Sequence, residues 1–343
     1  VLADGVSLMD LVVPSVDGYL NGLGSHLYWH GLKVDVTPPG TWTASLESPG
    51  FLINSAWYAV HTVGGKPLLA RWLPRLEAVA GHLEAHDTDG DGIVDSVDTG
   101  HWFDTYKLPA GVKEAHSTAV NYEAFGNLAE LEELAGNSEK AAHYRARAKL
   151  IKDNYLKMFF NPETGVIGGW RDKEGKLHDR MFPWVNGYAI CVGLVDDALA
   201  KSIVEKFVAK MKEIGFGEAQ YKYGMLTNLL PMENDEWNHH GAHAWQGYMN
   251  GSITPPYSHY FLMALYRHGF RDVAEKMLWA QVESFDKGTF NAGVRIPYMP
   301  QRNPVGSAFY TWDGAQSVGE GYLPENWHAY ASLFAGHYGI RFD

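Results

Sequence analysis

The stretch HSTAVNYEAFGNLAELEELA (116–135), GN (136–137), SEKAAHYRARAKLIKDNYLKM (138–158) decides the fold class. In both long halves, apolar residues recur at the three- and four-residue spacing of an amphipathic helix. Gly136 suits a helix C-terminal cap, because glycine tolerates the left-handed conformation that such caps use. The stretch therefore predicts a hairpin of two helices joined by a short turn.

The same helical pattern recurs along the chain, and strand-like alternation is nearly absent. Pro49 and Pro67 suit first-turn positions, Gly269 suits a C-terminal cap, and Asp196 can cap the helix that follows it. The expected class is all-α, with helices near 6–21, 49–63, 67–85, 116–135, 138–158, 184–195, 197–214, 252–268, 271–284 and 325–337.

Short turns alternate with long segments between these helices. The turns are Gly64-Gly65-Lys66, Gly136-Asn137 and His268-Gly269. Long loops inside a compact chain usually carry function, and in a barrel of helical hairpins they would emerge on one face. One loop, from Gly165 to Leu177, is expected to hold a small β-hairpin. The long polar and aromatic segments are 23–46, 86–114, 159–183, 215–247 and 286–322.

The composition excludes several classes of protein. The chain has 343 residues and a formal charge of −12, which opposes binding to nucleic acid or to an anionic membrane. No apolar stretch is long enough to span a bilayer, and the single cysteine, Cys191, cannot form an internal disulfide. The first ten residues lack a signal-peptide pattern, so the chain is expected to be cytoplasmic or to have lost a signal. Compartment and oligomeric state stay open.

Aromatic residues are abundant, with 12 Trp, 19 Tyr and 15 Phe. Tryptophans in loops have two interpretations: they anchor large loops, or they form a platform on which the apolar faces of a sugar stack. Eight together favour a carbohydrate ligand. The loop tryptophans are Trp29, Trp42, Trp102, Trp170, Trp184, Trp237, Trp245 and Trp312.

The segment from Asp87 to Asp98 resembles a calcium-binding loop. Its acidic residues occupy positions 1, 3, 5, 9 and 12, with glycine at position 6. Two interpretations stay open: a structural calcium ion, or an acidic turn closed by hydrogen bonds of its own side chains. The candidate ligands are Asp87, Asp89, Asp91, Asp95 and Asp98.

Directly after this turn the chain reads Gly100-His-Trp102-Phe103-Asp104-Thr. An acidic turn followed by two aromatic residues and aspartate resembles the acid-bearing loop of the glycogen-debranching amylo-glucosidase and related six-hairpin glycosidases. The resemblance implies that Asp104 is a general acid. Aromatic neighbours would also desolvate the Asp104 carboxyl, which would raise its pKa and keep it protonated. The alternative is that Asp104 caps a turn or pairs with Lys107.

The second carboxylate that hydrolysis needs is expected late in the chain. The resemblance places the base in the loop before the last helix, ahead of Trp327. Glu320 is preferred because glycines flank it, and Asp313 and Glu325 stay as alternatives.

Two further segments resemble sugar-binding elements of the same families. Tyr248-Met-Asn250-Gly-Ser-Ile-Thr-Pro matches a segment that contacts substrate, with Thr254 in place of the usual tryptophan. The region from Trp42 to Glu47 lacks the family's Arg-Asp pair, and His116 stands where the debranching pattern carries glutamate. The substrate-binding residues expected are Trp42, Glu47, Trp102, His116, Trp184, Tyr248, Asn250, Trp312 and Trp327.

The resemblance runs from about Trp42 to Trp327 and implies an (α/α)6 barrel of helical hairpins, formed by residues 1–343 as one catalytic domain. Only five hairpins are predicted, so the first hairpin of the barrel would be short or absent. The implied function is an inverting glycoside hydrolase, with a carbohydrate substrate and no required cofactor. Exo or endo action, the sugar and its anomer stay open.

Histidines give a rival interpretation. Asn238-His239-His240-Gly-Ala-His243, with His116 and His259, could transfer protons in a sugar epimerase or a polysaccharide lyase of similar fold. A non-catalytic sugar-binding protein is the third class. A pair of carboxylates favours hydrolysis, and a pair of histidines favours the rival.

Overall fold

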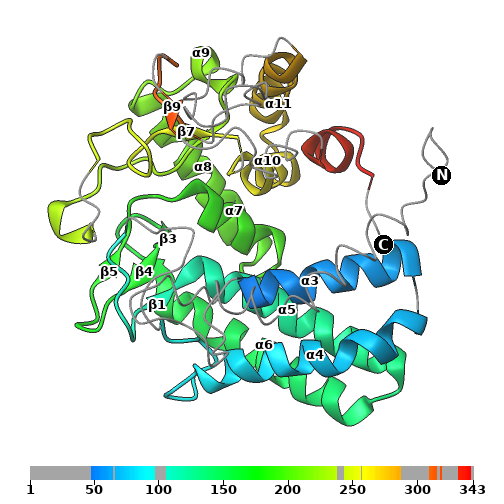
Figure 1. Cartoon of the computed structure of the whole chain (residues 1–343). Coiled ribbons are helices and arrows are strands. Elements are labelled where there is room, and N and C mark those ends of the chain that lie inside the picture. The colour runs from blue at the N-terminus through cyan, green and yellow to red at the C-terminus, as the bar shows by residue number, and fades with distance from the viewer. Residues whose placement is uncertain are drawn as a thin grey trace, which may run out of the picture. The chain divides into compact units, whose positions relative to one another are not determined.

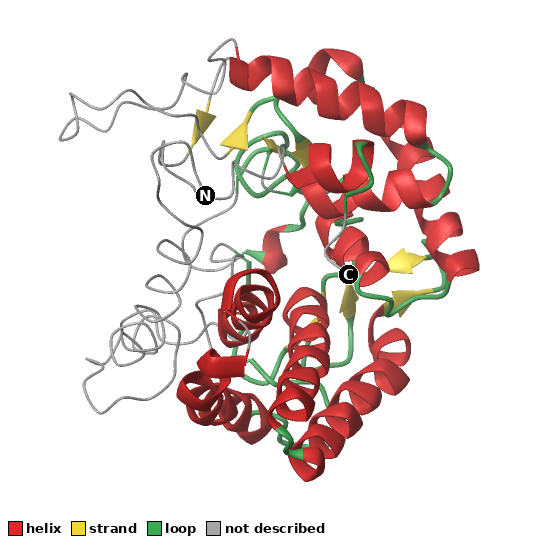
Figure 2. Ribbon diagram, turned by 90° about the vertical axis from the view of Figure 1, so that its right-hand side faces the viewer, coloured by secondary structure: helices red, strands yellow, loops and turns green. Residues whose placement is uncertain are grey.

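The computed structural model describes residues 48–64, 66–96, 106–237, 243–255, 257–286, 309–314, 317–318 and 331–340. Helices dominate these residues, and the strands among them are short (Figure 2). The chain divides into two compact units: the first holds most of the residues up to 176, and the second holds 105–107, 160–169 and the chain from Leu177 onward. None of the helices in the described ranges is long and apolar enough to cross a membrane.

The first unit is a group of four helices (Figure 1). These are α3 (Ser48–Ala59), α4 (Lys66–Ala85), α5 (Ala115–Ala135) and α6 (Ser138–Phe159), and α3 runs on into a π-helical turn, Val60–Gly64. Helix α5 packs against α3, α4 and α6. Its first seven residues are all buried, so α5 is the core element of this unit. The predicted hairpin of 116–135 and 138–158 is confirmed.

Local contacts set both ends of α5. The Glu114 carboxylate accepts hydrogen bonds from the backbone N–H groups of His116 and Ser117, each at 2.6 Å. At the other end, Gly136 adopts φ 87° and closes the helix, as its sequence position predicts. Strand β1 (Lys113–Glu114) leads into the helix and pairs antiparallel with β4 (Trp170–Arg171).

The second unit contains α7 (Pro183–Cys191), α8 (Asp197–Glu213), α9 (Glu218–Tyr221), α10 (Ser258–Arg267) and α11 (Arg271–Asp286). Helix α10 packs on α7 and α11. The approach to α7 is close, because a Cβ on Gly187 would lie 2.6 Å from the backbone nitrogen of Phe261. Asp196 caps α8 by accepting a bond from Leu199 N at 2.8 Å, as predicted.

Short strands connect the helices of the second unit. Strand β2 (Phe160–Asn161) pairs antiparallel with β3 (Val166–Ile167). A four-stranded antiparallel sheet follows in the order β6 (Met225–Leu226), β7 (Ile253–Thr254), β8 (Phe309–Tyr310) and β9 (Ser317–Val318). The remaining elements are β5 (Leu177–His178), a 3-10 turn at Asn234–Glu236 and a π-helical turn at Leu333–His337.

Two sequence expectations are corrected here. The helix expected at 252–268 begins only at Ser258, because Ile253 and Thr254 pair in the sheet and two prolines follow them. The helix expected at 184–195 ends at Cys191, before a turn in which Gly193 adopts φ 80°. The helix expected at 6–21 and the start of the one at 325–337 lie outside the described residues.

The hairpin expected at 165–177 is split. Val166 and Ile167 pair with the preceding strand β2, and the Asn186 side chain bonds both the N–H and the C=O of Ile167 at 2.9 Å. Within the same stretch the chain turns at Gly175, which adopts φ 84°, and Asp172 N donates to Lys176 O at 3.0 Å. The amide of Asn186 thus holds β3 in an arrangement that strand periodicity does not reveal.

Candidate active-site residues

Residues 243–251 form a tight loop in the second unit, hereafter the 243–251 loop. Gln246 and Tyr248 adopt positive φ values of 72° and 40°, which are uncommon for residues with a side chain. Backbone bonds join Gln246 N to Asn250 O at 2.7 Å and Asn250 N to Gly247 O at 2.9 Å. Such strained backbone tends to gather at functional sites.

The Asn250 side chain holds this loop in place. Its Oδ1 accepts a bond from Met232 N at 2.9 Å, and its Nδ2 donates to His243 O at 2.7 Å. Asn250 is buried, with 4% of its surface exposed. Its amide therefore joins two segments of the protein, and the substrate contact expected of Asn250 from the sequence stays a prediction.

Gly251 fits the end of the loop closely. Its N–H donates to Thr227 Oγ1 at 2.9 Å and to Asn228 Oδ1 at 2.7 Å. Its φ is 75°, and a Cβ added there would overlap the Trp245 ring. Glycine is needed at this position because the Trp245 indole lies directly against the backbone.

Six rings gather around the loop, and we call them the aromatic cluster. The distances between ring centroids are 6.2 Å for Trp245–Trp312, 5.0 Å for His243–Tyr248 and 4.7 Å for Tyr248–Phe309. The rings of Trp245, Tyr248, Trp312 and His243 are only partly buried. Half-buried indole and phenol rings provide faces for sugar C–H groups. The cluster consists of Trp237, His243, Trp245, Tyr248, Phe309 and Trp312.

Two predicted tryptophans differ in position. Trp312 donates its indole N–H to Gly251 O at 2.6 Å, so its ring is fixed at the loop. Trp184 is 3% exposed, stacks on Tyr257 at 4.8 Å and donates to Thr227 O at 3.1 Å. The structure thus brings Tyr248, Asn250 and Trp312 together and places Trp184 in the core behind them.

The segment after Asp104 is anchored in the second unit. Tyr106, two residues beyond Asp104 in the sequence, is 2% exposed and donates its hydroxyl to Met249 O at 2.6 Å. Its ring contacts Phe182 and Trp237 at 5.9 and 5.8 Å, and Lys107 N donates to Glu236 O at 2.7 Å. Tyr106 therefore contacts both the 243–251 loop and Trp237, and Lys107 bonds to the neighbouring Glu236.

Glu236 is a buried carboxylate that the sequence analysis missed. It accepts bonds from His178 Nδ1 at 2.8 Å and Arg180 Nε at 2.7 Å, and its side chain is 0% exposed. Burial alone would raise its pKa, but the bonds from His178 and Arg180 hold the pKa of this carboxyl below its usual range. A possible sequence signal was a glutamate directly before Trp237 in a long loop, although its partners lie 56 and 58 residues away.

His116 lies in the first turn of α5, in the first unit. It is 7% exposed, and its ring centroid lies 6.0 Å from that of Phe51. His259 on α10 forms a bond of 2.9 Å to Ser332 Oγ. His116 belongs both to the sugar contacts expected from the sequence and to the rival interpretation, and His259 belongs to the rival interpretation.

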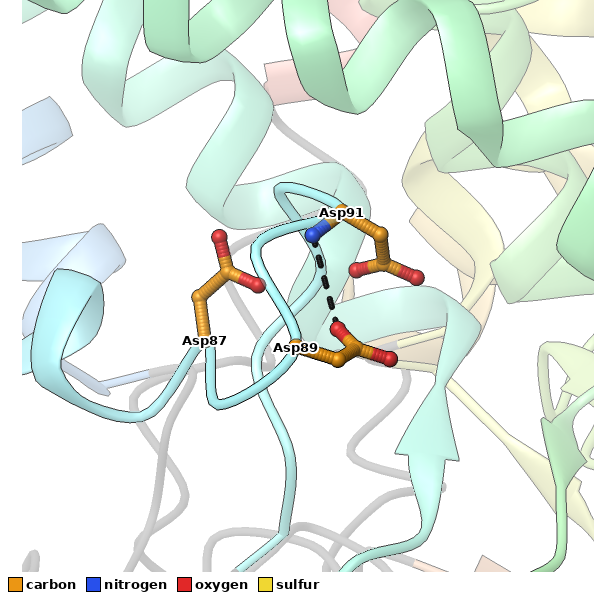
Figure 3. Close-up of side chains that lie close together, drawn as sticks. All are labelled: Asp87, Asp89 and Asp91. Carbon is orange, nitrogen blue, oxygen red and sulfur yellow. Dashed lines mark hydrogen bonds between the residues drawn. The ribbon is translucent and has the colours of Figure 1, made fainter.

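The acidic loop lies between α4 and β1, and Asp87, Asp89 and Asp91 gather there (Figure 3). One oxygen from each lies within 4.8 Å of the others, a spacing that could hold a metal ion. The loop also closes on itself: Gly92 N donates to Asp87 at 3.0 Å and Ile93 N donates to Asp91 at 2.8 Å. Asp95, the fourth predicted ligand, accepts a bond from Thr88 N at 3.0 Å.

Several predicted residues lie outside the described part of the chain. They include the candidate acid and the preferred base. Asp313, an alternative base, is exposed and accepts a bond from Thr311 Oγ1 at 2.6 Å. The residues outside the described ranges are Trp29, Trp42, Glu47, Asp98, Trp102, Asp104, Asn238, His239, His240, Glu320, Glu325 and Trp327.

The elements described above make a mostly helical fold, and the comparisons give its class. The profile of the bacterial α-L-rhamnosidase six-hairpin glycosidase domain matches residues 8–234. The chain belongs to this family. The resemblance to six-hairpin glycosidases and the expected (α/α)6-barrel class are thereby confirmed. A comparison with curated proteins gave no significant match.

Three solved structures are similar in fold. A family 78 rhamnosidase from a Bacillus species has a TM-score of 0.57 at 14% identity, over 93% of this chain and 29% of that one. A rhamnosidase from Klebsiella oxytoca with rhamnose bound has a TM-score of 0.55 at 15% identity, over 97% of this chain and 55% of that one. A family 63 mannosylglycerate hydrolase from Thermus thermophilus in complex with glucose has a TM-score of 0.61 at 13% identity, over 97% of this chain and 94% of that one. The chain thus spans less than two thirds of either rhamnosidase.

Proposed function

We propose that the protein is an inverting glycoside hydrolase in which Asp104 is the general acid. The observation that carries this proposal is membership of a six-hairpin glycosidase family, over a match that includes Asp104. The sequence around Asp104 independently resembles the acid-bearing loop of such enzymes. We also propose that the two compact units belong to one catalytic domain.

The proposed reaction uses two carboxyl groups. Asp104 donates its proton to the glycosidic oxygen as the bond from that oxygen to the anomeric carbon breaks. Glu320 takes a proton from a water molecule, whose oxygen bonds to the anomeric carbon from the opposite face. The products are a free sugar of inverted configuration and the alcohol, and calcium has no part in this reaction.

Sugar binding is assigned to the aromatic cluster. Its partly buried rings, Trp245, Trp312 and Tyr248, are held against a rigid loop, and fixed rings lose little freedom when a ligand stacks on them. Asn250 holds this loop, and its sequence-based assignment as a sugar contact stays a proposal, as does that of Trp184. The sequence-based assignments of Trp42, Glu47, Trp102, His116 and Trp327 as further sugar contacts stay as proposals.

An α-L-rhamnoside is the substrate to test first. The family is named for α-L-rhamnosidases, and one similar structure contains rhamnose. A mannosylglycerate hydrolase is also similar in fold, so mannosides and glucosides belong in the same panel.

The acid assignment is tested by the Asp104→Asn variant on aryl rhamnosides whose leaving groups differ in pKa. We expect kcat to fall about 10²–10⁴-fold on poor leaving groups and much less on p-nitrophenol, which departs without protonation. Asp153→Asn on α6 is the matched control, because Asp153 is an exposed aspartate paired with Lys149. An equal loss on all leaving groups, or no loss, would contradict the role of Asp104 as acid.

The same assays on Glu320→Gln, Asp313→Asn and Glu325→Gln identify the base. The base variant should lose activity on every leaving group, because water activation does not depend on the group that departs. For the rival isomerase interpretation, His243 is the residue to test, and its ring lies 5.5 Å from that of Trp237 and 5.0 Å from that of Tyr248. It would gain support if His243→Asn abolished exchange of a sugar C–H proton with solvent.

A further inference from the structure

The acidic loop has a positive charge of its own. The Lys113 ammonium lies 2.8 and 2.9 Å from the two carboxylate oxygens of Asp89, 2.7 Å from Asp91 Oδ2 and 3.8 Å from Asp95 Oδ1. Arg147 from α6 bonds Asp87 at 2.8 Å. All four described aspartates of the calcium-like pattern thus have a basic side chain nearby.

Lys113 is held deep in this arrangement. Its side chain is 10% exposed, and a buried ammonium is stable only when paired with acceptors. An ammonium has three N–H donors, and the two short-range carboxylates supply acceptors for them. The backbone adds to these contacts, because Lys113 and Asp95 form an isolated antiparallel β-bridge.

A calcium ion would need the same oxygens. Calcium binds six to eight oxygens at about 2.3–2.6 Å, and oxygens of Asp89 and Asp91 already face the ammonium. Two cations sharing these carboxylates would repel each other, so calcium would have to compete with Lys113 for them. The spacing of Asp87, Asp89 and Asp91 could hold a cation, and the Lys113 ammonium already supplies one at Asp89 and Asp91.

We propose that Lys113 takes the place of calcium and locks the acidic loop without a metal. The ion pairs of Lys113 join the loop after α4 to strand β1. The second residue of this strand, Glu114, caps α5. The inference is independent of the proposed hydrolase activity, because it concerns only how this loop is held.

The test is thermal unfolding of the whole chain, followed by circular dichroism in excess EDTA and in millimolar calcium chloride. The wild type should give the same Tm in both buffers, and isothermal titration with calcium should give no binding heat. Lys113→Met should lower the Tm by several degrees in EDTA, and Lys113→Arg should recover part of the loss because it keeps the charge.

Lys152→Met, at an exposed position on α6, is the matched control and should leave the Tm nearly unchanged. A wild type that loses several degrees in EDTA and recovers them with calcium would overturn the proposal. Calcium binding by the wild type in the titration would also overturn it, as would a Lys113→Met variant as stable as Lys152→Met.

Discussion

Gly251 links backbone conformation to the position of a candidate sugar-binding ring. It has φ 75°, and the Trp245 ring occupies the space of a Cβ. Its N–H bonds to Thr227 and Asn228 fix the end of the 243–251 loop. Adding a Cβ at Gly251 would therefore displace the backbone, the Trp245 indole ring or both.

At this scale we expect Gly251→Ala to destabilise the protein by about 2–4 kcal/mol, through backbone strain and overlap together. Chemical denaturation measures the change. Gly215→Ala is the matched control, because Gly215 has φ 77° with nothing near its missing Cβ, and it should cost only about 1 kcal/mol. Equal losses in the two variants would show that the Trp245 ring does not restrict the loop.

At the scale of elements, the contact between α4, α5 and the turn before α6 contains a buried acid. Glu132 on α5 is 0% exposed and accepts a bond from Asn137 at 2.7 Å, while Glu77 on α4 pairs with Lys140 at 2.7 Å. Burial raises the pKa of Glu132; the Asn137 bond opposes this, and the neighbouring Glu77 carboxylate adds to it. The folded protein therefore binds a proton at Glu132 more strongly than the unfolded chain does.

The pH dependence of stability follows from that difference. Unfolding free energy should fall as pH rises from about 4.3, the ordinary glutamate value, to the raised folded-state pKa, and the loss should remain above it. Glu132→Gln should flatten this part of the profile, because glutamine has no proton to lose. Urea unfolding from pH 4 to 8 measures the pH dependence of the unfolding free energy. Glu133→Gln is the control, because Glu133 is exposed. A Glu132→Gln profile identical to the wild type would contradict the raised pKa.

The sequence predicted elements well where the deciding signal was local. Gly136 and Asp196 mark the ends of their helices because caps act within one turn. The start of α10 was misplaced because Ile253 and Thr254 pair with the distant residues Leu226, Met225 and Tyr310. Lys113 and Glu236 were missed for the same reason: their charged partners are distant in sequence, and periodicity carries no information about them.

At the scale of the whole molecule, family membership and fold class agree with what the sequence predicted from short motifs. The fold could be predicted because helical hairpins repeat the same pattern many times, so single errors do not change the class. The site was less predictable. The aromatic cluster is assembled from segments near residues 237, 245 and 310, whose contacts depend on the folded chain.

The central claim is that the chain cleaves a glycosidic bond with inversion. The most direct measurement is proton NMR of the wild type acting on an α-L-rhamnoside, recording the anomeric signal of the first sugar released before it equilibrates in water. We expect β-L-rhamnose to appear first, with its intensity then shared with the α anomer. Initial release of α-L-rhamnose would contradict inversion, and no release from any glycoside in the panel would contradict the hydrolase itself.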